Sequence, residues 1–405
     1  MIFSAERLKL IEPSPTLAIS ARAKELQASG RDVIGFGAGE PDFDTPEHIK
    51  KAAIRALEAG QTKYTAVGGT PALKKAILEK FRRENNLEYK PSEVTVGNGG
   101  KQVLFNLFMA ILNPGDEVII PAPYWVSYAD MVRMAEGTPV LRYCPVEQDY
   151  LMTPAQLAEA ITPKTKAVII NSPSNPSGAT YHPDQLRELG KVLLNHPEIL
   201  IVSDDIYEHI IYDGIPFSNL AMLFPELKSR TIVINGVSKA YSMTGWRIGF
   251  GAGPASIIEN METIQGQSTS NACSIAQAAA VAALSESQDC IQEMVHAFHE
   301  RRSLVHRMLK SIPGIKTTLP HGSFYIFPDL SEIYSWPKFR DLLKTKDDTS
   351  ASRVFCAHLL DHYDVAAVPG NAFGDDRGMR ISYALGEANL RKGLERLGNM
   401  VNDLR

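Results

Sequence analysis

The chain between residues 231 and 250 reads T-I-V-I-N-G-V-S-K-A-Y-S-M-T-G-W-R-I-G-F. Its first four residues form an alternating, β-branched run, which predicts a buried strand. A turn through Asn235 and Gly236 follows, and Lys239 comes just after it among small and apolar neighbours. Desolvation at such a position disfavours the ammonium form and lowers the pKa of the lysine. The neutral amine is then available to form a Schiff base with an aldehyde.

Arg247 follows Lys239 at a spacing of eight residues, 247 − 239. It lies between Trp246 and Ile248, where its planar guanidinium is well placed to bind a phosphate group. An aldehyde that also carries a phosphate is pyridoxal 5′-phosphate, so the two residues together suggest this cofactor. The same pattern also fits a buried strand followed by a surface lysine and a structural arginine. For a lone lysine that simpler interpretation is the more common one, because lysine is rarely buried.

The composition is that of an ordinary globular enzyme. The chain has 405 residues, of which 44% are hydrophobic and 22% are charged, and its length predicts about two domains. A formal net charge of −4 offers no basic field for nucleic acid. No apolar run approaches the roughly 18 residues of a membrane span, and the N-terminus lacks the apolar core of a signal peptide. The four cysteines lack metal-binding spacing. We therefore expect a cytoplasmic protein without a bound metal and without nucleic-acid or membrane partners.

A glycine-rich turn links a strand to a helix earlier in the chain. Residues 94–96 predict a short strand, and residues 103–112 predict a helix. Between them lies G-N-G-G-K-Q, residues 97–102. Free N–H groups and the helix dipole make such a turn a phosphate site, although many similar turns bind nothing.

Charged residues also follow or interrupt two apolar strands. Asp204 and Asp205 follow the strand predicted for residues 199–202, after Ser203. A carboxylate there can pair with a protonated ring nitrogen, but the spacing alone does not choose between the two. Arg380 interrupts the apolar run M-R-I-S at residues 379–382. An unpaired charge would be costly there, so we expect Arg380 to have a carboxylate partner.

The stretch G-V-S-K-A-Y-S-M-T-G-W-R-I-G resembles the lysine signature of the class I aminotransferases, which are fold-type I pyridoxal-phosphate enzymes. The similarity runs over nearly the whole chain, and it includes G-A-G-E-P-D-F at residues 37–43 and S-P-S-N-P-S-G at residues 172–178. It is strongest to the subgroup Ib aspartate aminotransferases and, within them, to the bifunctional aspartate/prephenate enzymes. The resemblance implies an α/β fold with a large mixed-sheet α/β/α cofactor domain and a smaller α+β domain made from both termini. We expect an N-terminal arm over residues 1–45, the cofactor domain over 46–299 and the C-terminal small domain over 300–405.

The resemblance also implies a role for individual residues. Lys239 would form the Schiff base and transfer the proton, with Asp204 and Tyr207 as further catalytic residues. The family pattern D-[EDA]-x-Y favours Asp204 over Asp205 for the ring nitrogen. The cofactor-binding set is Lys239, Gly99, Gly100, Lys101, Trp125, Asn175, Asp204, Tyr207, Ser238, Arg247 and Tyr64. The substrate-binding set is Gly39, Trp125, Asn175, Arg380, Lys101 and Thr16.

Tyr64 would act on the partner subunit's cofactor phosphate in a homodimer. In the resemblance, Arg380 takes the substrate α-carboxylate, while Lys101 and Thr16 take the distal carboxylate. Glu12 departs from the pattern, since many relatives carry a basic residue at this position, and this makes activity on prephenate less secure than activity on aspartate.

The implied reaction is a ping-pong transfer of the amino group between L-aspartate or L-glutamate and a 2-oxo acid, through the Lys239 Schiff base. The acid pair would be 2-oxoglutarate and oxaloacetate, with prephenate to arogenate as an additional conversion. Two alternatives remain. A pyridoxal-phosphate C–S β-lyase would share Lys239 and Asp204 but would not need Lys101 and Thr16. A non-catalytic aminotransferase-like ligand sensor would carry an extra basic domain, for which the chain has no spare length.

Overall fold

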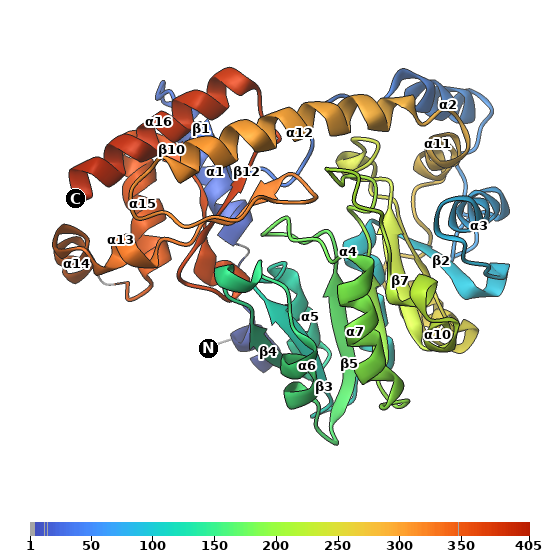
Figure 1. Ribbon diagram of the computed structural model, residues 1–405. Coiled ribbons are helices and arrows are strands. Elements are labelled where there is room, and N and C mark those ends of the chain that lie inside the picture. The colour runs from blue at the N-terminus through green and yellow to red at the C-terminus, as the bar shows by residue number, and fades with distance from the viewer. Residues whose placement is uncertain (1–4, 12, 14, 347) are drawn as a thin grey trace.

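Seven strands form a mixed sheet at the centre of the protein (Figure 1). The structure is a computed structural model that describes residues 5–11, 13, 15–346 and 348–405. The strand order is β2-β8-β7-β6-β5-β3-β4. Strand β8 runs antiparallel to β2 and β7, and the other neighbouring pairs are parallel. The strands are β2 (Val94–Gly97), β3 (Glu117–Ala122), β4 (Thr138–Tyr143), β5 (Thr165–Asn171), β6 (Leu200–Asp204), β7 (Thr231–Gly236) and β8 (Gly249–Ala252).

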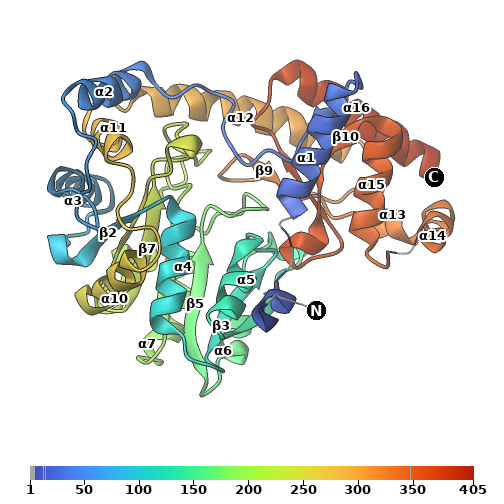
Figure 2. The same ribbon diagram turned by 180° about the vertical axis from the view of Figure 1, so that it is seen from behind.

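Side chains alternate along these strands, so the sheet has an apolar surface on each side. Val118 and Ile120 of β3 pack in one core, whereas Ile119 between them packs in another. The first core is covered by α4 (Gly100–Ile111), α5 (Ser127–Met134) and α10 (Ala255–Gly266), which lie in front of the sheet in Figure 2. The opposite core is covered by α6 (Pro154–Ala160), α7 (Pro183–Leu194), α8 (Leu220–Leu223) and α9 (Pro225–Lys228).

A third core lies beside the β2 edge of the sheet, under α2 (Glu47–Glu58), α3 (Pro71–Asn85) and α11 (Ser274–Ser285). Residues 265–284 are rich in small side chains, which predicts a helix over this stretch, but the structure divides it: α10 ends at Gly266 and α11 begins at Ser274. The backbone N–H groups of Ser268, Thr269 and Ser270 all donate to the Gln265 carbonyl. This closes the end of α10 with a tight turn in which Ser270 has a φ of 60°.

The C-terminal part of the chain forms a second body, joined to the first by the long helix α12 (Asp289–Lys310) (Figures 1 and 2). Its core also contains Ile34 and Phe36 from the N-terminal part of the chain. Strand β1 (Ile34–Gly35) pairs in parallel with β10 (Val365–Ala366). The remaining elements of this body are α1 (Pro15–Ala28), β9 (Tyr325–Ile326), α13 (Ser331–Ser335), α14 (Pro337–Lys344), α15 (Ala351–Tyr363), β11 (Val368–Pro369), β12 (Met379–Ser382) and α16 (Glu387–Leu404). The predicted α/β fold with a smaller body drawn from both termini is confirmed.

Single-turn helices connect several elements: η1 (Glu6–Leu10), η2 (Pro91–Glu93), η3 (Val146–Gln148), η4 (Thr244–Trp246) and η5 (Gly370–Phe373). The run G-S-F-Y-I-F at residues 322–327 predicts a strand, but the strand is limited to Tyr325–Ile326. The helix expected from Val103 begins instead at Gly100. The earlier start places the helix N-terminus at the glycine turn itself.

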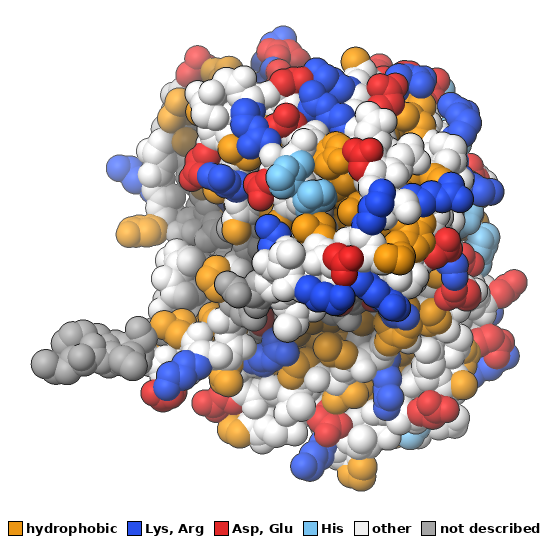
Figure 3. All heavy atoms as spheres, turned by 90° about the vertical axis from the view of Figure 1, so that its left-hand side faces the viewer, with side chains coloured by type: hydrophobic (Ala, Val, Ile, Leu, Met, Phe, Trp, Pro, Cys, Tyr) orange, Lys and Arg blue, Asp and Glu red, His pale blue; other side chains and the backbone are white. Residues whose placement is uncertain are grey.

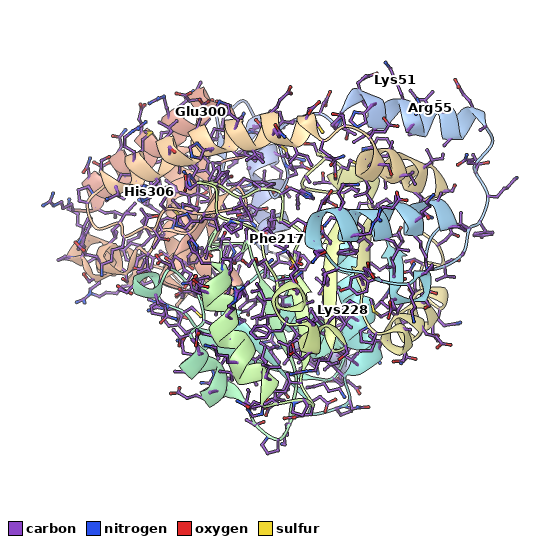
Figure 4. All side chains as sticks on the ribbon, turned by 45° about the vertical axis from the view of Figure 1, so that its right-hand side comes forward. Lys51, Arg55, Phe217, Lys228, Glu300 and His306 are labelled. Atoms are coloured by element: carbon purple, nitrogen blue, oxygen red, sulfur yellow. The ribbon has the colours of Figure 1, made fainter. Side chains whose placement is uncertain are left out.

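Charges on the outer surface are mixed. Basic and acidic side chains are interspersed over the face in Figure 3. Lys51 and Arg55 of α2 point outward into solvent (Figure 4). In the described part of the chain, no helix combines the length and apolar character needed to cross a membrane.

A buried ion pair connects helix α3 to the loop that follows β6. Lys80 of α3 pairs with Glu208, and their side chains are 1% and 4% exposed. Glu208 also accepts hydrogen bonds from the Asn85 and Asn235 amides, at 2.9 and 2.8 Å. Burial raises the pKa of Glu208, whereas Lys80 and His209 lower it. The lowering is larger than the rise, so the pKa of Glu208 lies below its usual value. The network therefore holds the end of α3, the loop after β6 and the end of β7 together around one carboxylate.

We expect Lys80→Met to destabilise the protein by about 3–5 kcal/mol, because it leaves the Glu208 carboxylate buried without its cation. The measurement is equilibrium unfolding in urea. The matched control is Arg391→Met, which removes a cation from the exposed Arg391–Glu387 pair of α16 and should cost less than about 1 kcal/mol. Equal losses in the two variants would contradict the importance given to the buried pair.

Candidate active site

The ends of β5, β6 and β7 open into a cavity of about 530 Å³ between the two bodies. The parallel register pairs Asn171 with Asp204 and Asp204 with Ile234, so the loops that follow these strands leave the sheet at one edge. Helix α1, the segment after β1 and strand β12 close the cavity from the second body. Predicted site residues that line it are Thr16, Gly39, Gly100, Lys101, Trp125, Asn175, Asp204, Tyr207, Ser238, Lys239, Arg247 and Arg380.

Lys239 extends into the cavity from the loop after β7. Its Nζ donates a hydrogen bond of 2.5 Å to the Gly39 carbonyl and lies 5.9 Å from the ring centres of Tyr207 and Phe324. Desolvation, helped by the nearby Arg380 and Arg247, lowers the pKa of Lys239 to about 8, against the opposing charges of Glu40 and Asp204. The amine is therefore much closer to its nucleophilic neutral form than a solvated lysine.

The structure distinguishes the two adjacent aspartates. Asp204 lines the cavity, accepts a hydrogen bond from the Tyr128 hydroxyl and is buried, which raises its pKa to about 6. The Asp205 carboxylate instead accepts hydrogen bonds of 2.7 Å from Ser203 and from Asn219. Asp204 alone of the two is placed to meet a ligand in the cavity, which agrees with the choice made from the sequence.

Arg247 and the glycine turn face each other. The Arg247 backbone has a φ of 55°, in the left-handed region, and its guanidinium donates to the carbonyls of Thr244 and Asn98 at 2.8 and 3.3 Å. Gly99 has a φ of 85°, and a Cβ at this position would lie 2.9 Å from the Arg247 Cζ. Glycine is therefore required here for both backbone conformation and space. The arrangement brings a guanidinium to the N-terminus of α4, where anions bind.

No Asp or Glu of the described residues pairs with Arg380, so the carboxylate partner expected for it stays a prediction that involves the substrate. Its Nη1 donates to the Asn175 side-chain oxygen at 3.1 Å and its Nη2 to the Gly37 carbonyl at 2.8 Å. Its Nε is buried and has no partner among the described residues. Tyr325 and Phe373 lie 4.6 and 5.1 Å from the guanidinium. The charge is thus held by neutral acceptors and aromatic rings, which leaves N–H donors free for an external carboxylate.

Lys101, in the first turn of α4, and Trp125 line the same cavity. The Lys101 Nζ is 5.1 Å from the centre of the Trp125 ring, and burial together with Arg247 lowers the pKa of Lys101. Thr16 of α1 lines the same cavity. Glu12 lies outside the described residues. Lys101 therefore adds a further cation to a cavity wall that also contains Lys239, Arg247 and Arg380.

Several lining residues were not found from the sequence. Tyr128 follows Trp125 by three residues, one helical turn, and this spacing was the only signal for it. Tyr325 contacts the site through its hydroxyl, which lies 3.1 Å from the Tyr207 hydroxyl. Glu40, Ser20 and Lys24 also line the cavity. These residues enter the site through tertiary packing, which no local pattern reveals.

Tyr64 does not reach the cavity of its own chain. It lies between α2 and α3, and 91% of its surface is exposed. The predicted role of Tyr64 needs a second subunit, so it stays a prediction.

The cavity residues fit a phosphorylated pyridine aldehyde. The glycine turn with Arg247 offers donors for a phosphate, Asp204 offers a buried carboxylate for a ring nitrogen, and Lys239 offers an amine for the aldehyde. Trp125 lines the same space and offers an aromatic face to the ring.

Comparison with known proteins agrees with this geometry. The sequence profile of the family described as aminotransferase class I and II matches residues 31–397. The chain belongs to the class I and II aminotransferase family. Aminotransferases of this family depend on pyridoxal 5′-phosphate, so the cofactor prediction is confirmed.

This aminotransferase is 52% identical over 398 residues to the aspartate/prephenate aminotransferase of Nitrosomonas europaea, with 98% of this chain and 99% of the relative covered. It is similar in structure to the aspartate aminotransferase of Rhizobium meliloti, with a TM-score of 0.93, 48% identity and 99% of both chains covered. It is also similar to the aspartate aminotransferase of Thermus thermophilus with maleate, with a TM-score of 0.89, 42% identity and coverage of 98% and 100%. The predicted family and fold-type are confirmed.

We expect Asp204→Asn to weaken cofactor binding by about ten- to a hundredfold, since a charge-assisted hydrogen bond is worth roughly 1.5–3 kcal/mol. Affinity is measured by titrating the apoenzyme with pyridoxal phosphate and following the absorbance. Asp205→Asn is the matched control and should keep most of the affinity, because the Asp205 carboxylate faces Ser203 and Asn219. A large loss in Asp205→Asn with little loss in Asp204→Asn would reverse the assignment.

Proposed function

We propose that this aminotransferase moves the amino group of L-aspartate or L-glutamate to a 2-oxo acid, with 2-oxoglutarate and oxaloacetate as the acid pair. The observation that carries the proposal is the presence of two cationic anchors, Arg380 and Lys101, in the wall of the cavity that contains Lys239. A dicarboxylic substrate has a carboxylate for each anchor. A monocarboxylic substrate leaves the second anchor unused.

Arg380 is the anchor for the α-carboxylate. A guanidinium has five N–H donors, and two of them already donate to Asn175 and Gly37. The buried Nε is free among the described residues, and a planar guanidinium edge binds a carboxylate with two parallel hydrogen bonds. The other anchor combines the point charge of Lys101 with the Thr16 hydroxyl, which together suit a distal carboxylate.

The relatives support the same substrate class. The Nitrosomonas europaea and Cereibacter sphaeroides proteins are named aspartate/prephenate aminotransferases. The Thermus thermophilus structure is a complex with maleate, a four-carbon dicarboxylate. We extend the proposal to prephenate as an amino acceptor that yields arogenate, because its ring carboxylate can use Lys101 and Thr16.

When bound, pyridoxal phosphate supplies an aldehyde for the amine and a ring that accepts electrons from Cα. Lys239 Nζ removes the proton from the substrate Cα and later returns a proton, as general base and general acid. With the cofactor bound, Asp204 would offer a carboxylate to the ring nitrogen, while Asn175 and Tyr207 would offer an amide and a hydroxyl to the phenolic oxygen. Gly99, Gly100, Ser238 and Arg247 would hold the phosphate. Gly39 and Trp125 would complete the substrate wall.

The proposed assembly is a homodimer in the cytoplasm in which Tyr64 binds the phosphate held by the partner subunit. Its support is the exposure of Tyr64 at 91%, together with Ile54 and Leu57 of α2 at 52% and 55%. Large apolar side chains that are exposed in the single chain can be covered by a protein partner. The four cysteines are free thiols, as expected in a reducing compartment. We also retain the division into residues 1–45, 46–299 and 300–405 as a proposal.

We expect the pyridoxal form to react with aspartate far faster than with alanine in a single half-reaction. The measurement is the rate at which the absorbance of the pyridoxal form is lost. Lys101→Ala should lower kcat/KM for aspartate by about ten- to a hundredfold, through loss of one charge-assisted contact, and should change the rate with alanine little.

Lys239→Ala provides the inactive control, and it should still bind the cofactor through phosphate and ring contacts. Thr16→Val should reduce activity with prephenate at least as much as with aspartate. Equal losses for aspartate and alanine in Lys101→Ala would contradict the dicarboxylate proposal. Release of ammonia and a 2-oxo acid from a β-thio amino acid would instead indicate a C–S lyase.

A further inference from the structure

Residues 37–45 form a connecting segment between β1 and α2, and the first four of them line the cavity. We call this segment the strap. It links the second body, where β1 pairs with β10, to the helices beside the large sheet. The strap therefore crosses the site between the two parts of the molecule that build it.

Backbone carbonyls of the strap accept hydrogen bonds from both central cations of the site. The Arg380 Nη2 donates to Gly37 at 2.8 Å, and the Lys239 Nζ donates to Gly39 at 2.5 Å. A change in the position of the strap thus changes the surroundings of both side chains at once.

The far end of the strap is fixed to the loop that follows Lys239. The Thr45 hydroxyl donates to the Ser242 carbonyl at 2.7 Å and accepts from the Trp246 indole at 2.9 Å. The position of Thr45 directly before Pro46 predicts an N-cap for α2, but this prediction is wrong. The helix has no side-chain cap, and the Thr45 hydroxyl has these two partners instead. Asp42 is held from the other side by Arg301, at 2.6 Å.

Glu40, in the middle of the strap, forms a further hydrogen bond to the loop that follows Lys239. Its carboxylate accepts a hydrogen bond of 2.7 Å from the Thr244 hydroxyl. The Thr244 carbonyl in turn accepts from the Arg247 guanidinium at 2.8 Å. One short chain of contacts therefore runs from the strap to the arginine proposed to hold the cofactor phosphate.

We propose that Glu40 is a positioning residue, which fixes the strap to the loop carrying Arg247 and places a negative charge opposite Lys239. This inference rests on the proposed role of Lys239 as the cofactor lysine. No lysine, arginine or histidine of the described residues forms an ion pair with Glu40, so its charge stays available to the cavity that it lines.

The charges around Lys239 explain why this carboxylate matters. Arg380 from β12 and Arg247 from the loop after η4 lower the pKa of Lys239, while Glu40 from the strap and Asp204 from β6 raise it. In the proposed function Asp204 is committed to the ring nitrogen of the cofactor. Glu40 is then the remaining carboxylate that offsets the two arginines.

The test uses the apoenzyme and pyridoxal phosphate. The rate of cofactor capture is followed by absorbance as a function of pH, and the attachment site is identified after borohydride reduction. Neutral amine is the reactive form, so the wild-type rate should rise with pH with a midpoint near 8. Ionisation of the cofactor itself is common to all variants and does not affect differences between midpoints.

Glu40→Gln keeps an oxygen that accepts from Thr244 but removes the charge. We expect its midpoint to fall by about half a pH unit, equal to a roughly threefold larger fraction of neutral amine at a fixed pH below the midpoint. Glu40→Asp retains the charge and should restore most of the wild-type midpoint. Asp44→Asn is the matched control, because Asp44 lies in the same strap with a side chain that is 99% exposed, and it should leave the midpoint unchanged.

Thr244→Val removes the hydroxyl that donates to Glu40 and changes no charge. We expect it to weaken cofactor affinity severalfold while moving the midpoint less than Glu40→Gln does. An unchanged midpoint in Glu40→Gln, an equal shift in Asp44→Asn, or unchanged affinity in Thr244→Val would each overturn the role of Glu40. Failure of the wild-type protein to capture the cofactor at Lys239 would instead overturn the proposed function, and the inference with it.

Discussion

The parallel pairing of β5, β6 and β7 is the constraint on which the whole site depends. Neighbouring strands that run in the same direction end at the same edge of a sheet, so the loops that follow them must meet there. The register sets Asn171 beside Asp204 and Asp204 beside Ile234. Asn175, Tyr207 and Lys239 lie in the loops just beyond these positions and enter one cavity, although long stretches of sequence separate them. The buried Lys80–Glu208 pair then holds two of these loops in place.

The site concentrates cations with few compensating charges from the protein. The described lining residues include the cations Lys24, Lys101, Lys239, Arg247 and Arg380 and the carboxylates Glu40 and Asp204. Such an excess of positive charge is unfavourable in the protein without its ligands, since each cation loses hydration. The cofactor phosphate and the substrate carboxylates supply the missing negative charge. Part of their binding energy therefore comes from relieving a repulsion that the fold maintains.

Residues that lie in continuous motifs at strand ends were predictable from the sequence. Lys239, Asp204 and the glycine turn each follow an apolar run that marks a strand, and Arg247 belongs to the same continuous motif as Lys239. The structure brings them together. Thr45 was assigned wrongly because sequence shows only the neighbouring backbone, whereas its partners Ser242 and Trp246 come from about two hundred residues away. Tyr128, Tyr325 and Glu40 were missed for the same reason. Their contacts depend on how helices and loops pack, and local patterns do not encode this.

The pairing of β1 with β10 has a consequence for how the protein matures during synthesis. Every cofactor-side residue proposed within a single chain lies between Gly99 and Arg247, in the body that the ribosome completes first. Strand β1 cannot pair until residues 365–366 have emerged, and Arg380 follows later still. Contacts between the two ends of a chain close slowly, and domains generally fold as units in the order of synthesis. The nascent chain can thus complete the part that contains Gly99 to Arg247 early, whereas Arg380 joins the cavity wall only after β10 has emerged and paired with β1.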